Sequence, residues 1–157
     1  PGRLDDGLGP ALAECVAGLG LANVSTEAFY QLSVEDSLEL ALCDVVVFAD
    51  ATVDKQRPFA LTVIEPDANA SFTTHSVSPG AVLSLAGSVH GACPDAYLLT
   101  IRGHEFDAFG EVLSEPAKQD LQAAFEFLAP LLEARDPNLF REAAAEPDSS
   151  QPTCSHG

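Results

Sequence analysis

The sequence predicts an α/β fold, with a three-layer, doubly wound and mostly parallel sheet that carries helices on both faces. An apolar run rich in β-branched residues at 44–50 is typical of a strand buried on both faces. Segments with helical periodicity lie before and after this strand, so that helices and strands alternate along the chain. The length of 157 residues suits one domain, and a hydrophobic content of 46% supplies its core.

Three elements are expected before the buried strand. Residues 9–19 form a helix, with Pro10 in its first turn and apolar residues at helical spacing. Residues 23–29 form a short edge strand. A second helix begins after Ser33, which caps it, carries acidic residues in its first turn and runs to about Leu42.

Four further elements are expected after that strand, and a tail closes the chain. They are a strand at 59–65, a helix from Ser78 to about Gly91, a strand at 96–101 and a helix from Ser114 to about Ala134. Each of these helices begins with a serine, whose side chain accepts hydrogen bonds from the first turn. Residues 1–136 therefore form the domain, and residues 137–157 are expected to be a polar, disordered tail.

The charge balance of the chain restricts its partners. Twenty-four Asp and Glu residues against seven Lys and Arg residues give a formal net charge of −17. Such a chain lacks the basic patches that neutralise phosphates, which argues against nucleic acid and against anionic membranes. Its field favours cations and basic partner surfaces.

Cysteine usage and the hydropathy pattern indicate a cytoplasmic protein. Cys15, Cys43, Cys93 and Cys154 show no paired spacing and are expected to be free thiols in a reducing compartment. No apolar run approaches the roughly 20 residues needed to cross a bilayer. We also expect no signal peptide, since the sequence starts with Pro1-Gly2-Arg3 followed by acidic residues.

Acidic and imidazole side chains stand where hydrophobic runs give way to loops. Asp5 and Asp6 lie near the start, Asp50 follows the buried strand, and His75 lies in the middle of the chain. Ligands of doubly wound sheets bind beyond the carboxyl ends of the strands. Carboxylates with an imidazole suit a borderline divalent metal such as nickel, zinc or iron. If these loops converge, the chain can bind a metal ion or a metal-loaded partner.

Five short segments, taken in order, carry a resemblance to a known family. They are PGRLDDGLGP at 1–10, FADA at 48–51, TTHSVSP at 73–79, IRG at 101–103 and FGE at 109–111. Through them the chain resembles the hydrogenase maturation endopeptidases, which trim the C-terminus of the large subunit of nickel–iron hydrogenases. The resemblance spans roughly residues 1–133.

The resemblance implies a function and a set of site residues. Asp6, Asp50 and His75 would be both the catalytic and the metal-binding residues. The partner would be a [NiFe] hydrogenase large-subunit precursor, and the nickel would arrive in that precursor rather than being stably bound. A hydrolytic centre of the chain's own is not visible, because the sequence has neither His-Glu-x-x-His nor Gly-x-Ser-x-Gly.

The chain departs from the family pattern at two places. Family members begin with a strand and a Gly-x-Gly-Asn turn before the Pro-Gly-Arg segment, and neither is present in this sequence. The first strand of the fold is therefore expected to be missing. Some members also carry the histidine after the Ser-Pro pair, where this chain has Gly80, which leaves His75 as the candidate imidazole.

Two other functions stay open. An inactive, truncated member of the peptidase family is one. A phospho-accepting receiver domain is the other, with Asp5 and Asp6 holding magnesium and Asp50 accepting phosphate. A receiver needs a lysine just after its last strand, whereas the chain has Arg102 there and its only lysines are Lys55 and Lys118.

The remaining charged residues have less specific interpretations. Arg102 is expected to form an ion pair that stabilises a loop, with a clamp on the substrate's carboxyl end as the alternative and Glu111 as a possible partner. His90 and His104 are expected to be surface or helix-end residues.

Overall fold

The computed structural model describes residues 4–28, 32–67, 69, 77–106 and 112–145. In chain order its elements are the 3-10 helix η1 (Leu4–Gly7), α1 (Leu8–Ala17), α2 (Asp36–Ala41), β1 (Val45–Thr52), β2 (Phe59–Val63), α3 (Pro79–His90), β3 (Asp95–Arg102), α4 (Glu115–Ala134) and α5 (Pro137–Ala145). No helix among these residues is long and apolar enough to span a membrane.

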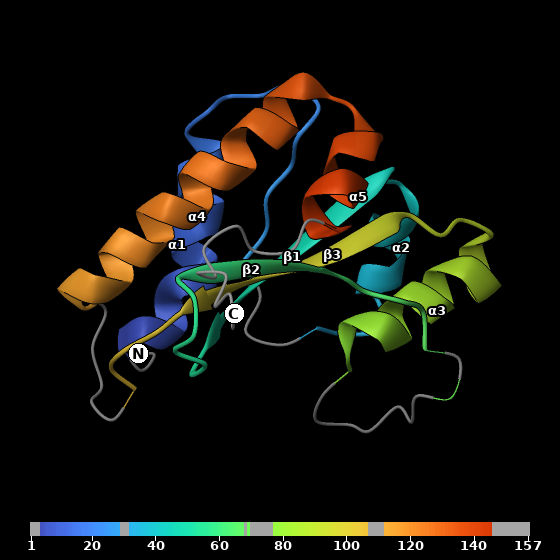
Figure 1. Cartoon of the computed structure of the whole chain (residues 1–157). Coiled ribbons are helices and arrows are strands. Elements are labelled where there is room, and N and C mark those ends of the chain that lie inside the picture. Colours follow the sequence, from blue (N-terminus) through green and yellow to red (C-terminus); the bar gives the residue numbers. More distant parts are fainter. Residues whose placement is uncertain (1–3, 29–31, 68, 70–76, 107–111, 146–157) are drawn as a thin grey trace, which may run out of the picture.

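The described strands form one sheet with β3 in its centre (Figure 1). β1 pairs with β3 in parallel, so that Asp50 lies opposite Thr100 and Thr52 opposite Arg102. β2 pairs with the other edge of β3 and runs antiparallel. The sheet is therefore mixed rather than mostly parallel, because the short connection at 53–58 turns the chain back. A parallel crossover needs a dozen or more residues.

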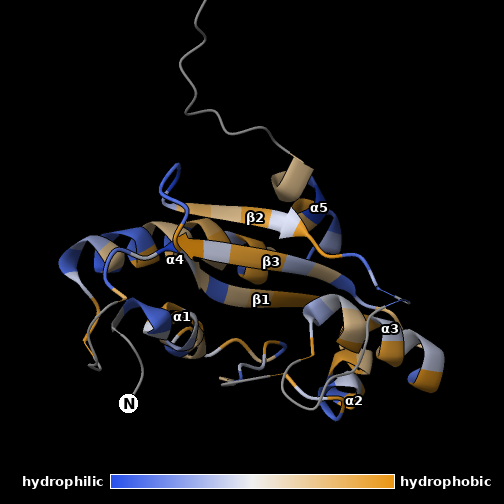
Figure 2. Cartoon of the chain, turned by 90° about the horizontal axis from the view of Figure 1, so that it is seen from below, coloured by the Kyte–Doolittle hydropathy of each residue, from blue (hydrophilic) through white to orange (hydrophobic). Residues whose placement is uncertain are grey.

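Helices cover both faces of this sheet, which confirms the three-layer α/β prediction. Side chains alternate between the faces of a strand. In β1, Val45 and Val47 pack into a core cluster with residues of α1, α4 and α5, whereas Val46 and Phe48 pack with residues of α2 and α3. Figure 1 shows α4 and α5 above the sheet and α3 below it. Figure 2, which views the sheet from below, shows β1 and β3 as largely hydrophobic ribbons.

Helix starts agree with the sequence where the signal is local. The Ser78 Oγ atom accepts a hydrogen bond from the Ala81 amide at 3.2 Å, and the Ser114 Oγ atom accepts one from Ala117 at 3.3 Å. Both serines are N-caps, as predicted. The helix expected after Ser33 instead begins at Asp36, whose Oδ2 atom accepts a hydrogen bond from the Ser33 amide at 2.7 Å.

The edge strand expected at 23–29 is wrong for the residues that the structure describes. Residues 23–28 form no strand. Val24 packs against the cluster beside α1 and α4, and its described neighbours up to residue 28 do not join a hydrophobic cluster. The segment therefore lacks the alternating apolar face that anchors a strand on a core.

The boundary of the expected disordered tail is also wrong. Residues 137–145 form α5, and residues 146–157 lie outside the described part of the chain. Phe140 is only 4% exposed, and its ring centroid lies 5.7 Å from that of Tyr97 on β3. Arg141 also pairs with Asp95 at 3.1 Å. The sequence did not indicate this helix because its anchoring depends on contacts of Phe140 and Arg141 with β3, which is distant in the sequence.

Candidate functional site

The carboxyl ends of β1 and β3 form one edge of the sheet, and η1, which carries Asp6, lies at the same edge. The Gly103 amide donates to the Thr52 carbonyl oxygen at 2.8 Å, so the chains leave the two strands side by side. The Asp5 amide donates to the Glu105 carbonyl oxygen at 3.0 Å, which brings η1 to the same edge. In Figure 1 the blue start of the ribbon lies beside the tip of the β3 arrow.

Asp6 and Asp50 are both exposed at this edge. Asp6 lies on η1 and, among the described residues, makes no hydrogen bond or ion pair. Asp50 is part of β1, which continues to Thr52, so this aspartate lies inside the strand rather than just after it. Its Oδ1 atom accepts a hydrogen bond from the Ala51 amide at 2.9 Å. By alternation its side chain belongs to the same face as Phe48.

A close backbone contact joins the segment of Asp6 to that of Asp50. A Cβ atom on Gly9 would lie 2.7 Å from the Ala49 carbonyl oxygen and 3.9 Å from the Asp50 Cα atom. Glycine is therefore required where α1 meets β1. Asp6 precedes Gly9 by about one helical turn, a rise of roughly 5 Å. The structure thus brings together the two segments that the sequence predicted to converge.

The third predicted residue, His75, lies outside the described residues, as does Glu111. The described residues contain no group of three or more His, Cys, Asp and Glu side chains suited to a metal. The predicted set of Asp6, Asp50 and His75 is not tested by this finding, because His75 is not among the described residues. The position where some family members carry histidine is crowded. A Cβ atom on Gly80 would lie 2.9 Å from the Glu65 carbonyl oxygen.

Asp5 is a buried carboxylate whose partners the sequence did not reveal. Its exposed fraction is 0%, and its Oδ2 atom accepts hydrogen bonds from the His104 amide (2.7 Å), the Glu105 amide (2.7 Å) and the Ser114 hydroxyl (2.8 Å). Its Oδ1 atom accepts from the Ser114 amide at 2.9 Å. Burial raises the pKa of Asp5, but the hydrogen bonds from Ser114, His104 and Glu105 outweigh it, so the pKa lies below its ordinary value.

A second buried carboxylate, Asp120 on α4, binds the segment that follows β3. The Arg102 guanidinium contacts it in a bidentate manner, with Nε to Oδ2 at 2.9 Å and Nη2 to Oδ1 at 3.1 Å. The His104 ring Nε2 atom lies 2.7 Å from Oδ2. Burial raises the pKa of Asp120, yet hydrogen bonds from Arg102 and His104 bring it below its ordinary value. The hydrogen bonds that Arg102 donates to Asp120 raise the pKa of Arg102.

These contacts decide two interpretations of the sequence. The loop-stabilising ion pair of Arg102 is confirmed, with Asp120 as its partner. The expectation that His104 is a surface or helix-end residue is wrong, because its side chain is only 24% exposed and bound to Asp120. His90 is the last residue of α3, as expected. The signal for Asp120 was its place on the inward face of α4, between Ala117 and Ala124.

The receiver interpretation loses its support at Asp5. A receiver would need this carboxylate for magnesium, but both of its oxygen atoms accept hydrogen bonds within the protein. The residue at the end of β3 is Arg102, which is paired with Asp120 and does not offer an amine to a phosphorylated aspartate.

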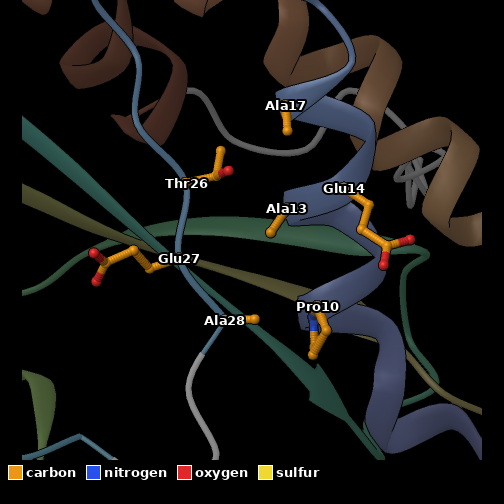
Figure 3. Close-up of a pocket in the computed structure, with 7 residues that line it drawn as sticks. All are labelled: Pro10, Ala13, Glu14, Ala17, Thr26, Glu27 and Ala28. Carbon is orange, nitrogen blue, oxygen red and sulfur yellow. The ribbon is translucent and has the colours of Figure 1, made fainter.

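A shallow hollow of about 250 Å³ lies between α1 and residues 26–28 (Figure 3). Small side chains and two glutamates line it: Pro10, Ala13, Glu14, Ala17, Thr26, Glu27 and Ala28. Neither Asp6 nor Asp50 contributes to this hollow. It is therefore separate from the edge that carries the predicted site.

The overall structure is similar to several solved structures. HybD, the hydrogenase maturating endopeptidase from E. coli, superposes with a TM-score of 0.64 at 18% identity, over 85% of this chain and 87% of that chain. The [NiFe] hydrogenase maturation protease HycI from Thermococcus kodakarensis KOD1 gives 0.57 at 22% identity, over 83% and 85%. The chain has the fold of the hydrogenase maturation proteases.

Other comparisons agree with this assignment of the fold or give no result. The hydrogenase 2 maturation peptidase from Thaumarchaeota archaeon SCGC_AB-539-E09 has the maturation protease fold as well, with a TM-score of 0.58 at 19% identity over 83% of this chain and 90% of that chain. No protein-family model matches the sequence, and a search of curated proteins found no match. The predicted resemblance is therefore confirmed in its fold.

Proposed function

We propose that this protein is an endopeptidase that removes the C-terminal extension of a nickel-loaded [NiFe] hydrogenase large-subunit precursor. Asp6, Asp50 and His75 recognise the nickel of that precursor. The observation that carries the proposal is the close approach of Gly9 to the Ala49 carbonyl oxygen and the Asp50 Cα atom, which places the chain segments of the two exposed aspartates next to each other. The maturation protease fold supports the same reaction.

The two aspartates have the properties that a visiting cation needs. Asp6 has no competing partner among the described residues, and Asp50 uses only Oδ1 in its bond to Ala51, which leaves Oδ2 for a ligand. Exposed carboxylates at one edge of the sheet create a negative potential that attracts a divalent cation. The formal net charge of −17 strengthens that attraction at long range.

The imidazole of the set is assigned to His75 from its place in the chain. His75 precedes Val77 by two residues, which limits the separation of their Cα atoms to about 7.6 Å. Val77 packs in the same cluster as Phe48, on the face of the sheet to which Asp50 belongs. Gly80, the alternative position, has no room for a ring beside the Glu65 carbonyl oxygen.

The site would act mainly by positioning. Carboxylate and imidazole donors that complete the coordination of the precursor's nickel would fix the scissile peptide in one place, which replaces a costly bimolecular encounter. The same nickel would polarise the peptide carbonyl or the attacking water. A precursor without nickel lacks this anchor, so cleavage would follow metal insertion.

The test compares nickel-loaded with nickel-free precursor. Each is mixed with the purified protein, and the mass of the large subunit is followed over time. The proposal expects a shortened product from the nickel-loaded precursor and none from the nickel-free one. Equal cleavage of the two precursors would refute nickel recognition. Cleavage of neither precursor would support the alternative of an inactive member of the family.

A further inference from the structure

We infer that Asp5 is the positioning residue that sets the place and direction of Asp6. This inference rests on the proposed function, because it gives Asp5 a role in the recognition of nickel by its neighbour. Asp5 is entirely buried and Asp6 is exposed, although they are consecutive residues of η1. The buried carboxylate therefore fixes the backbone from which the exposed one projects.

The bonds of Asp5 cross large distances in sequence. His104, Glu105 and Ser114 are separated from it by 99, 100 and 109 residues, and all donate to its carboxylate. The Asp5 amide in turn donates to the Glu105 carbonyl oxygen at 3.0 Å. The side chain of Asp5 is thus tied to two segments and its main chain to one of them, which leaves η1 little freedom to shift or rotate.

A tight contact on the other side completes the anchoring. A Cβ atom on Gly103 would lie 3.1 Å from the Asp5 Cβ atom and would collide with the Phe106 ring. The absence of a side chain at Gly103 lets η1 approach the end of β3. The Cα atom of Asp6 lies about 3.8 Å from that of Asp5, so a displacement of Asp5 also displaces Asp6.

Asp120 and Arg102 contact the segment whose amides donate hydrogen bonds to Asp5. The His104 amide donates to Asp5, while its ring contacts Asp120, which Arg102 holds at the end of β3. Within the described part of the chain, the hydrogen bonds of Asp120 go to Arg102 and His104 and to no residue of η1, so Asp120 can affect Asp6 only indirectly, through His104 and Asp5. Its removal therefore costs stability in the same region and provides a matched control for the specific effect of Asp5.

The experiment measures KM and kcat for cleavage of nickel-loaded precursor by the full-length protein and two variants. Asp5→Asn and Asp120→Asn each replace one buried carboxylate by an amide, and both are assayed at a temperature where circular dichroism shows them folded. Asp5→Asn is expected to raise KM about tenfold, because misplaced Asp6 weakens recognition by about 1.4 kcal/mol. Asp120→Asn is expected to keep KM within about twofold.

The outcomes separate the inference from the function on which it rests. If the parent cleaves the precursor, the positioning role is overturned by an unchanged KM in Asp5→Asn or by equal increases of KM in Asp5→Asn and Asp120→Asn. A parent that does not cleave refutes the proposed function instead. If Asp5→Asn does not fold, Ser114→Ala replaces it, since this change deletes only the hydroxyl donor to Asp5 Oδ2 and the cap on Ala117. It should raise KM about threefold, and an unchanged KM overturns the inference.

Discussion

Asp5 and Ser114 stand 109 residues apart in the sequence and share two hydrogen bonds, from the serine amide to Oδ1 at 2.9 Å and from its hydroxyl to Oδ2 at 2.8 Å. The oxygen of the same hydroxyl accepts a hydrogen bond from the Ala117 amide in the first turn of α4. One serine therefore fastens the start of α4 to the buried Asp5 of η1. Local capping and long-range attachment meet in a single side chain.

The contact of Gly9 with β1 leads to a first prediction. Gly9→Ala places a methyl group 2.7 Å from the Ala49 carbonyl oxygen, which the strand cannot avoid by rotating a side chain. We expect the free energy of unfolding to fall by about 1–3 kcal/mol, the usual range for overpacking. Urea unfolding followed by circular dichroism measures this change.

A glycine in the same part of the chain serves as control for that experiment. A Cβ atom on Gly7 would meet only the Leu113 side chain at 3.7 Å, an ordinary contact. Gly7→Ala should leave the free energy of unfolding within about 0.5 kcal/mol of the parent. Equal losses in both variants would contradict a special role for the approach at Gly9.

The buried carboxylates predict how stability depends on pH. Asp5 and Asp120 both have a folded-state pKa below the ordinary value of 3.8. Between the folded and unfolded pKa values the unfolded chain binds more protons, so stability is complete above about pH 4 and is lost as pH falls through the folded pKa values. Chemical unfolding between about pH 2 and pH 6 should show this decline.

Substitution of either carboxylate tests the origin of that decline. Asp5→Asn and Asp120→Asn each remove one titrating group, so each variant should lose stability at neutral pH and show a shallower decline in acid. Glu142 provides the control, because it is exposed on α5. A Glu142→Gln variant should keep the parent's profile, and unchanged acid slopes in both Asp variants would contradict the assignment.

The pairing of Arg102 with Asp120 yields a third prediction. Arg102→Ala leaves a carboxylate that is only 8% exposed without its bidentate partner, which typically costs about 3–5 kcal/mol. The double variant Arg102→Ala/Asp120→Ala should cost clearly less than the sum of the two single changes, because no charge remains buried alone. A thermodynamic cycle from denaturant unfolding measures the coupling energy, and strictly additive losses would refute it.

Local signals predicted the starts of α3 and α4 and the strand at β1, but not its burial. β1 is only partly buried at one edge of the described sheet, and the buried central strand is β3. Ser78 and Ser114 cap helices through bonds to residues three positions away, so the pattern around each serine was sufficient. α5 depends on Phe140 reaching Tyr97, a residue of another element. A single aromatic residue such as Phe140 does not by itself indicate such a contact in the sequence.

The candidate site was predicted in part for the same reason. Strand-end position and residue type marked Asp50, and the structure describes it in β1 beside the segment of Asp6. The resemblance pointed to Asp6 as the site residue, but residue type alone could not show that Asp5 turns inward, because that depends on amides about 100 residues away. Which of two adjacent carboxylates turns inward is a tertiary property.

The two exposed aspartates support the last prediction, which concerns catalysis rather than stability. Asp6→Asn and Asp50→Asn each remove the charge of a proposed nickel ligand without changing side-chain size at exposed positions. Each should therefore keep the parent's unfolding midpoint and lose cleavage of nickel-loaded precursor by about a hundredfold, within the range found for lost positioning of a reacting group. Glu14→Gln, which removes an exposed charge from α1 beside the hollow, should cleave at the parent rate. Parent-like cleavage by both Asp variants would remove these residues from the site, because side chains that hold the precursor's nickel cannot be neutralised without loss.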